Sequence, residues 1–128
     1  MNYTVADIII RIKNAAMAGR KTTVLPMSKF AKSILEVLKK EGFISSFKED
    51  KALKTLTVEI VYVNRMPALN EVKIISRPSV RVYKDKKALE NKRSKGIKTT
   101  IISTSKGVMT TREAMEKSLG GEILFEIW

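Results

Sequence analysis

The spacing of apolar residues changes along this chain, and the change limits the folds that it can adopt. Between Val5 and Ile12 the apolar residues recur at i, i+3, i+4 and i+7, as on the buried face of a helix. Between Leu56 and Tyr62 they alternate, as on a half-buried strand. Helices and strands are therefore both expected, and the predicted fold class is α/β in the broad sense (α+β).

The first half of the chain has the pattern of two helices separated by a strand. The first helix is expected to begin after Thr4 and to end at Gly19. The second is expected to begin with Ser28 as its N-cap and to end at Gly42. The strands predicted in this half span residues 22–26 ("TTVLP"), 43–49 ("FISSFKE") and 53–63 ("LKTLTVEIVYV"), with "DKA" as the turn between the last two.

The second half is richer in predicted strands. Thr110 and Glu113 have the spacing of a capping box and predict a short helix, which Gly120 and Gly121 are expected to stop. The segment before this helix, "STSKG", has the pattern of a loop that leads from a strand into the helix. The other predicted elements are strands at residues 71–76, 97–103 and 122–128, a turn with an edge strand at 77–83, and a lysine-rich connection at 84–96. In the last strand, Ile123, Phe125 and Ile127 are expected to share one face.

A boundary between two domains is expected at "NRMPALN", where Pro67 interrupts the strand pattern. The predicted domains are a helix-rich α/β domain over residues 1–66 and a mainly β domain with a short helix over residues 67–128.

The net charge indicates the class of partner. The chain carries 25 Lys and Arg against 13 Asp and Glu, which gives a net charge of +12 and a pI of about 10.0. Such a surface releases counterions when it binds a polyanion, so nucleic acid is the expected partner. A membrane surface would favour a lysine-rich amphipathic helix with bulky apolar anchors, and no segment shows that combination. A basic surface that only aids solubility stays open at this point.

The composition argues against most kinds of catalysis. With no cysteine and no histidine, the chain lacks a thiol nucleophile, the commonest metal ligand and the side chain best suited to proton transfer near neutral pH. It also lacks cofactor-binding motifs such as C-x-x-C, a Walker loop or G-x-G-x-x-G. No cofactor, metal or small-molecule substrate is predicted, and the absence of disulfide chemistry and of a signal or membrane segment favours a cytoplasmic location.

The segment Ser103, Thr104, Ser105, Lys106 and Gly107 admits three interpretations. As S-x-x-K it fits a serine hydrolase with Ser103 as nucleophile and Lys106 as base, but those enzymes hold both residues on one helical turn and use companion motifs that are absent here. As a polar turn it could serve only to cap the helix that follows. As a recognition loop, its hydroxyls would bind base edges and ribose 2′-OH groups and its lysine would bind phosphate, and the net charge favours this interpretation.

Other candidate contacts lie outside that loop. Lys29 and Lys32 stand at the start of the second helix, where the macrodipole disfavours cations, so they could surround a phosphate or be a tolerated surface pair. Arg11 and Asn14 share a helix face away from the isoleucines and could contact RNA or be solvated. Arg77 and Arg81 are further candidate phosphate contacts.

Residues 101–128, "IISTSKGVMTTREAMEKSLGGEILFEIW", closely resemble the C-terminal signature of the universal family of ribosomal protein eight of the small subunit, in its bacterial type. Upstream, "ADIIIRIKNA", "LPMSK", "EGFI" and "SRPSVRVY" resemble other landmarks of the family, so the resemblance covers essentially the whole chain. It implies a non-enzymatic protein of the small ribosomal subunit that binds the central domain of the subunit's RNA early in assembly. Neighbouring subunit proteins and, in some bacteria, the messenger RNA of its own operon are implied partners, and a plastid ribosome is not excluded.

The resemblance also implies which residues contact the RNA. The "STSKG" loop would read an irregular RNA helix, and Arg11, Asn14, Ser28, Lys29 and Glu126 would add contacts. A non-ribosomal RNA-binding regulator remains the main alternative to this function, and the serine hydrolase is the other.

Overall fold

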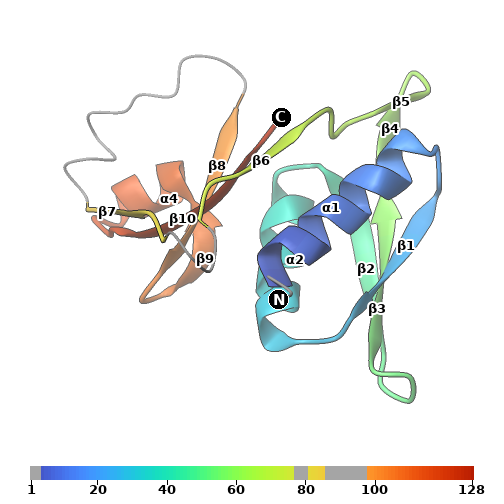
Figure 1. Cartoon of the computed structure of the whole chain (residues 1–128), viewed down its shortest axis with the longest axis horizontal. Helices are drawn as coiled ribbons and strands as arrows, with labels where there is room; N and C mark the ends of the chain where they lie inside the picture. The colour runs from blue at the N-terminus through green and yellow to red at the C-terminus, as the bar shows by residue number, and fades with distance from the viewer. Residues whose placement is uncertain (1–3, 77–80, 86–97) are drawn as a thin grey trace. The chain divides into compact units, whose positions relative to one another are not determined.

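The computed structural model describes residues 4–76, 81–85 and 98–128, and the chain divides into two compact units, Met1–Glu71 and Val72–Trp128 (Figure 1). Helices and antiparallel sheets occur together, which confirms the predicted α+β class.

The first unit places two helices on one face of a three-stranded antiparallel sheet (Figure 1). The strand order is β1-β3-β2, so the last strand in sequence lies between the other two. The elements are α1 (Thr4–Met17), β1 (Thr22–Pro26), α2 (Lys29–Lys40), β2 (Ile44–Asp50) and β3 (Thr55–Ile60).

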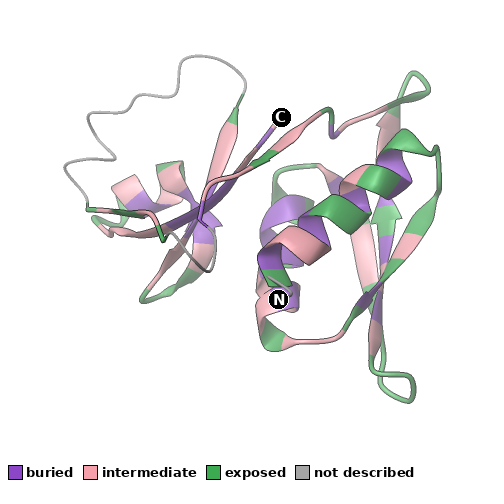
Figure 2. Cartoon of the chain, viewed as in Figure 1, coloured by how far each residue is buried: buried purple, intermediate pink, exposed green. Residues whose placement is uncertain are grey.

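The core of this unit lies between the helices and the sheet. Leu25 of β1 faces Leu56 of β3 across the sheet, and both side chains are fully buried. Ile9 and Ile12 of α1 are buried to the same degree. Buried and exposed residues alternate along this helix (Figure 2). The opposite face of the sheet is polar, with residues such as Glu59, because an antiparallel sheet can cover one face and leave the other in water.

The helix ends follow the sequence predictions. Gly19 and Gly42 have positive φ values of 71° and 84°, which only glycine adopts without strain. Ser28 is the N-cap of α2, and its hydroxyl accepts a hydrogen bond from the backbone N–H of Ala31 at 3.0 Å.

The strand predicted over residues 53–63 is shorter in the structure. It begins at Thr55 because Lys54, with φ of 54°, still belongs to the turn. It ends at Ile60, and β4 (Tyr62–Val63) then pairs with β5 (Met66–Pro67) as a separate hairpin.

The segment "NRMPALN", expected as a domain boundary, is held in the first unit. Asn64 and Arg65 form the two-residue turn of the β4–β5 hairpin, with φ values of 52° and 66°. After the hairpin, Ala68 donates its backbone N–H to the Val61 carbonyl at 3.0 Å. An ion pair from Lys13 to Glu71 ties the next residues to α1, so the division between units follows Glu71.

In the part of the second unit that the structure describes, one antiparallel sheet packs against a short helix. The strand order is β6-β10-β8-β9, and β7 also pairs with β10. The elements are β6 (Val72–Ile74), β7 (Tyr83–Lys84), β8 (Thr99–Thr104), β9 (Gly107–Thr110), α4 (Thr111–Glu116) and β10 (Gly121–Ile127). Buried apolar side chains of β8, β9, α4 and β10 form its core, namely Ile102, Met109, Ala114 and Ile123.

The segment between β8 and α4 is a strand and not the predicted loop. Residues Gly107–Thr110 pair with Ile101–Thr104, so "STSKG" is the end of a β-hairpin. Thr110 then caps α4 by accepting a hydrogen bond from the Glu113 backbone N–H at 3.2 Å, as the capping-box spacing predicts.

The last strand departs from strict alternation at one point. Ile123 pairs with Ile102 and Phe125 pairs with Ile101, so Leu124 is an additional residue in a β-bulge. Leu124 is buried like its neighbours, and its carbonyl accepts the backbone N–H groups of Ile75 and Ser76. Because Ile101 and Ile102 point to opposite faces of β8, Ile123 lies on the opposite face from Phe125 and Ile127, and the prediction that these three residues share one face is wrong.

Gly120, just before β10, and Gly121, its first residue, do not end the helix as predicted. Helix α4 ends at Glu116, and the residue with positive φ after it is Ser118, at 58°. The glycines instead permit close backbone approach. A Cβ on Gly121 would lie 2.1 Å from the Ser103 carbonyl oxygen, and one on Gly120 would lie 2.6 Å from the Lys84 carbonyl oxygen.

The predicted connection at residues 84–96 lies outside the described residues except for Lys84 and Asp85.

Gly121→Ala is expected to lower the free energy of unfolding by on the order of 3 kcal/mol, because the added methyl group overlaps backbone atoms that must move. Gly19→Ala is the control, because its Cβ would meet nothing within 4 Å and only its positive φ is unfavourable. That control should lose about 1 to 2 kcal/mol. Denaturant unfolding followed by circular dichroism measures both, and equal losses would contradict the close approach.

Candidate nucleic-acid interface

The β8–β9 hairpin presents Ser105 and Lys106 at its tip. Thr104 is opposite Gly107 in the strand register, so these two residues form the turn. Neither Ser105 nor Lys106 has a positive φ. The positive φ that closes the turn occurs instead at Gly107, with a value of 115°. A Cβ on Gly107 would meet nothing within 4 Å, so this glycine is needed for backbone conformation and not for space.

The Thr104 hydroxyl holds the turn closed. It donates to the Gly107 carbonyl at 2.9 Å and accepts the Lys106 backbone N–H at 3.2 Å. A hydroxyl has one donor and two acceptor lone pairs, so its only donor is already used within the hairpin. Thr104 is therefore suited to shaping the turn, and only one lone pair remains for a ligand.

Ser103 lies on β8, half-buried, at the base of the hairpin. Its neighbours across the sheet are Val108 and Glu122. Glu122 forms an ion pair with Arg81, with 3.1 Å between Oε2 and Nη1. The close approach of Gly121 fixes the backbone at Ser103, so the hairpin rises from a defined position on the sheet.

The two tip side chains are available to a ligand. Ser105 and Lys106 are exposed, and no hydrogen bond or ion pair joins either side chain to another part of the chain that the structure describes. The hydroxyl can donate to or accept from a base edge or a ribose 2′-OH, and the ammonium group can bind a phosphate. One neutral and one charged recognition group therefore stand side by side on a rigid turn.

The same geometry overturns the hydrolase interpretation. Ser103 lies in a strand and Lys106 in the turn after it, so they are not on one turn of a helix as an S-x-x-K nucleophile and base would be.

Glu126 lies on β10 away from the hairpin tip. It is opposite Lys73 of β6 on one side and Thr100 of β8 on the other. Because side chains alternate along a strand, Thr100 and Ser103 point to opposite faces, so the register puts Glu126 and Ser103 on different faces of the sheet. The structure does not bring these two predicted contacts together.

The structure explains one of the two lysines at the start of α2. Lys32 forms an ion pair with Glu49 of β2, with 2.7 Å between Nζ and Oε1. Lys29 is exposed, and no ion pair connects it to the described residues. Ser28 uses one lone pair for the cap and keeps its O–H as a donor. Lys29 and Ser28 are therefore better placed to meet a phosphate than Lys32.

Arg11 and Asn14 line a shallow depression of about 400 Å³ beside α1. The guanidinium of Arg11 is oriented by Asp7, 3.1 Å away, and reaches the Val24 carbonyl of β1 at 3.5 Å. Arg20 and Thr23 also line this depression and were not predicted as contacts. Both residues come after the end of α1, and they lie beside Arg11 because the chain turns back at Gly19 into β1.

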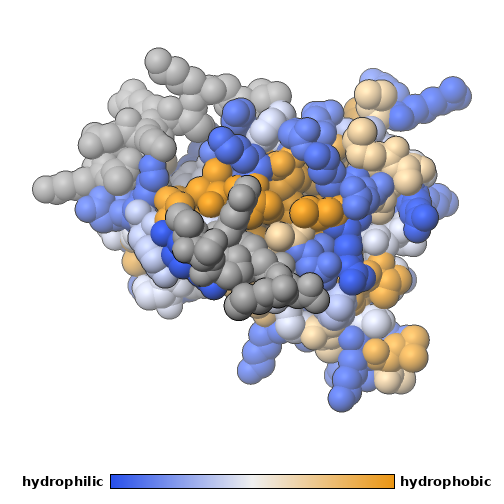
Figure 3. All heavy atoms as spheres, in the orientation of Figure 1, coloured by the Kyte–Doolittle hydropathy of each residue, from blue (hydrophilic) through white to orange (hydrophobic). Residues whose placement is uncertain are grey.

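Arg77, predicted as a phosphate contact, lies outside the described residues. Hydrophilic side chains project at many points of the face shown in the space-filling view (Figure 3). Within the described ranges, no cluster of acidic residues could hold a metal ion. No described helix is long and apolar enough to span a membrane.

Comparison with known proteins identifies the relatives of this chain. A family model described as "Ribosomal protein S8" matches residues 3–128. Proteins named "Small ribosomal subunit protein uS8" are 43% identical in Trichormus variabilis, over 99% of this chain and 98% of the relative, and 43% identical in Marinomonas sp., over 100% and 98%. The protein of that name in Rippkaea orientalis is 44% identical over 99% and 98%.

Thr104→Val is expected to release the Lys106 backbone N–H from protection against hydrogen exchange, because its acceptor is removed while the side-chain shape is kept. Thr104→Ser keeps the hydroxyl and should keep most of the protection. Amide exchange followed by NMR measures both variants. If the two variants exchange this amide at the same rate, the hydroxyl does not hold the turn.

Proposed function

Since the chain belongs to the ribosomal protein S8 family, we propose that it binds an irregular helical element in the central domain of small-subunit ribosomal RNA and supports assembly of that subunit. The family is a structural one, so no catalytic residue is assigned. Relatives over the full length carry the name of a small-subunit protein, which supports a place in the ribosome for this chain as well.

The observation that carries the proposal is the tip of the β8–β9 hairpin. Ser105 and Lys106 are exposed together, while Thr104 and Gly107 fix the turn that presents them. A preorganised tip loses little conformational entropy on binding, so its contacts contribute more fully to affinity. This arrangement suits a narrow or distorted groove in RNA better than a flat protein surface.

Lys106 would contribute mainly to affinity, and Ser105 would contribute mainly to specificity. Lys106 would contact a phosphate, which positions the protein but does not read the sequence. Ser105 would bond a base edge or a 2′-OH, which distinguishes one RNA from another. The net charge of +12 adds long-range attraction that is independent of sequence.

Further contacts are assigned by family resemblance together with exposure. Arg11, Asn14 and Lys29 of the first unit are exposed and suited to the RNA backbone. Ser28 can donate its hydroxyl hydrogen to the RNA. Lys32 would contribute positive charge to the RNA contact, and its ion pair with Glu49 neutralises part of that charge. In the second unit, Ser103, Arg81 and Glu126 would lie at the margin of the RNA contact, with Arg81 bound to Glu122.

Two finer partners belong to the same proposal. Proteins adjacent in the small subunit would contact surfaces that the RNA leaves uncovered. A messenger RNA that imitates the ribosomal helix would bind the same hairpin, because the tip reads local shape and hydrogen-bonding groups.

Lys106→Ala and Ser105→Ala are expected to behave as two different classes of variant. Lys106→Ala should weaken binding to matched and mismatched RNA alike, and should reduce the slope of log K against log salt by about 0.9, or one phosphate contact. Ser105→Ala should leave the slope unchanged and weaken binding to the matched RNA by on the order of 1 to 3 kcal/mol. Filter binding of a central-domain RNA fragment over a salt series measures both.

Lys51→Ala is the matched control, because Lys51 is an exposed turn lysine of the first unit. It should change neither specificity nor affinity by a comparable amount. If Lys106→Ala and Ser105→Ala give the same pattern as the control, the hairpin is a structural turn and the proposal fails.

A further inference from the structure

Strand β1 forms an open edge of the three-stranded sheet in the first unit (Figure 1). The residues on either side of it bond toward β3. The Lys21 carbonyl accepts the Ile60 backbone N–H at 2.9 Å, and the Met27 backbone N–H donates to the Lys54 carbonyl at 3.0 Å. Because this direction alternates along an antiparallel strand, every second residue between them points its backbone groups away from β3. These residues are Thr22, Val24 and Pro26, and their outward backbone groups are called the β1 edge below.

The guanidinium of Arg11 covers the middle of the β1 edge. Its Nη1 donates from α1 to the Val24 carbonyl at 3.5 Å. Asp7, one helical turn earlier, accepts a hydrogen bond from Nε of Arg11 at 3.1 Å and so holds the guanidinium in this direction. The contact lies outside the ladder of the sheet, and it occupies an acceptor that another strand would need in order to pair with β1.

Strand β1 has little protection of its own. It contains no charged residue, and the side chain of Val24 is 49% exposed. Pro26 removes one N–H from the end of the edge. Within the part of the chain that the structure describes, Arg11 is the one side chain that bonds to the outward groups. A short strand of Thr, Val and Leu with free backbone groups is the kind of edge that pairs with another strand.

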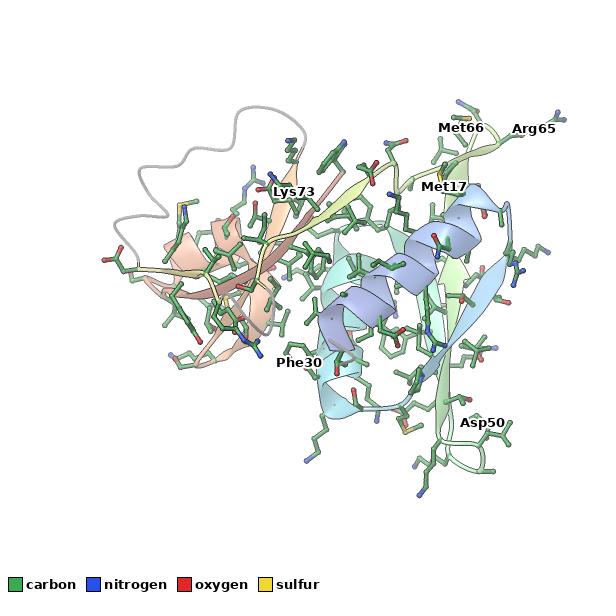
Figure 4. All side chains as sticks on the ribbon, viewed as in Figure 1. Met17, Phe30, Asp50, Arg65, Met66 and Lys73 are labelled. Atoms are coloured by element: carbon green, nitrogen blue, oxygen red, sulfur yellow. The ribbon has the colours of Figure 1, made fainter. Side chains whose placement is uncertain are left out.

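Strand β2, at the opposite edge of the same sheet, is protected differently. Its register with β3 shifts at Ser45, as at a β-bulge. Its second half carries Lys48, Glu49 and Asp50, and Asp50 lies at the end of the strand beside the turn into β3 (Figure 4). Bulges and charged side chains both oppose pairing at an open edge. The β2 edge therefore carries its own protection, whereas the β1 edge depends on a side chain from α1.

A second copy of this chain offers a strand that matches the β1 edge. Two β1 strands can pair antiparallel about a two-fold axis at Val24, because Val24 is the middle residue of Thr22–Pro26. Each Val24 would exchange its N–H and C=O with the other, and each Thr22 N–H would meet a Pro26 carbonyl. The exposed Val24 side chains would then contact each other on one face. Arg11 occupies the carbonyl at the centre of this arrangement.

We infer that Arg11 keeps the free chain monomeric by blocking the pairing of β1 with β1 of a second copy. Asp7 is a positioning residue, because it acts through the guanidinium that it holds. The inference concerns the chain before it binds RNA, and it stands apart from the RNA contact proposed for Arg11.

The test compares self-association of the full-length chain with and without this contact, in the absence of RNA. Arg11→Ala removes the guanidinium and keeps a residue that favours helix, so the fold is retained. Arg112→Ala is the matched control, because Arg112 is also an exposed arginine on a helix. Both variants lower the net charge of +12 by one, so both change the repulsion between copies equally. Sedimentation velocity over a concentration series measures the association.

Arg11→Ala should associate more tightly than the unsubstituted chain by on the order of ten-fold, because each copy gains the acceptor that Arg11 had occupied. Arg112→Ala should sediment like the unsubstituted chain. Asp7→Asn should give a weaker form of the association, since the guanidinium is then released but still present. Adding Val24→Lys to Arg11→Ala should restore the monomer, because a lysine on an edge strand opposes pairing.

A single cysteine locates the contact, because the chain has none of its own. In the Arg11→Ala chain, Val24→Cys should form an intermolecular disulfide on mild oxidation. The Cα atoms of two such paired residues lie about 5.5 Å apart, which a disulfide can span. Leu53→Cys in the same chain is the control, because Leu53 is 72% exposed in the turn between β2 and β3. It should stay unlinked.

An Arg11→Ala chain that stays as monomeric as the unsubstituted chain would overturn the inference. Equal association of Arg11→Ala and Arg112→Ala would assign the effect to net charge and overturn it as well. Association that Val24→Lys does not reverse, or a disulfide that forms equally at position 53, would place the contact elsewhere on the chain, with the same consequence. Since no RNA is present, each of these failures leaves the proposed function untouched.

Discussion

At Gly121 the backbone of β10 lies against β8 so closely that a Cβ would come within 2.1 Å of the Ser103 carbonyl oxygen. This contact fixes the register of the two strands at the end where the β8–β9 hairpin begins. The bulge at Leu124 then moves the following residues by one position, so that Phe125 and Ile127 are buried on the face of the sheet opposite to Ile123. The position of the candidate RNA-binding tip therefore depends on Gly121, where the close backbone approach leaves no room for a side chain.

The residues of the "STSKG" segment have separate functions in the folded chain, although they are adjacent in the sequence. Thr104 uses its donor to close the turn, and Gly107 adopts the positive φ. Only Ser105 and Lys106 are left exposed at the tip without an internal partner among the described residues. Thr104 and Gly107 thus shape the turn, while Ser105 and Lys106 are available to a ligand. The internal hydrogen bonds of Thr104 are what distinguish its hydroxyl from that of Ser105.

The periodic elements could be predicted from the sequence because local signals determine them. The helix ends at Gly19 and Gly42 and the cap at Ser28 agree with the structure, since φ preference and capping act over a few residues. Contacts between distant residues could not be predicted in this way. The pairing of Lys32 with Glu49 needs β2 beside α2, and the role of Gly121 needs β8 beside β10. The sequence predicts a loop at the short strand β9 because these residues contain too little alternation to indicate a strand.

Directed hydroxyl-radical probing tests most directly whether the β8–β9 hairpin contacts one defined region of small-subunit ribosomal RNA. Lys106→Cys gives a single attachment site for iron-EDTA because the chain has no other cysteine. When the labelled protein binds the RNA, strand cleavage should be confined to one short irregular stretch of the central domain, and the same label on Lys51→Cys should not cleave there. Cleavage spread evenly along the RNA, or identical from both positions, would contradict the claim.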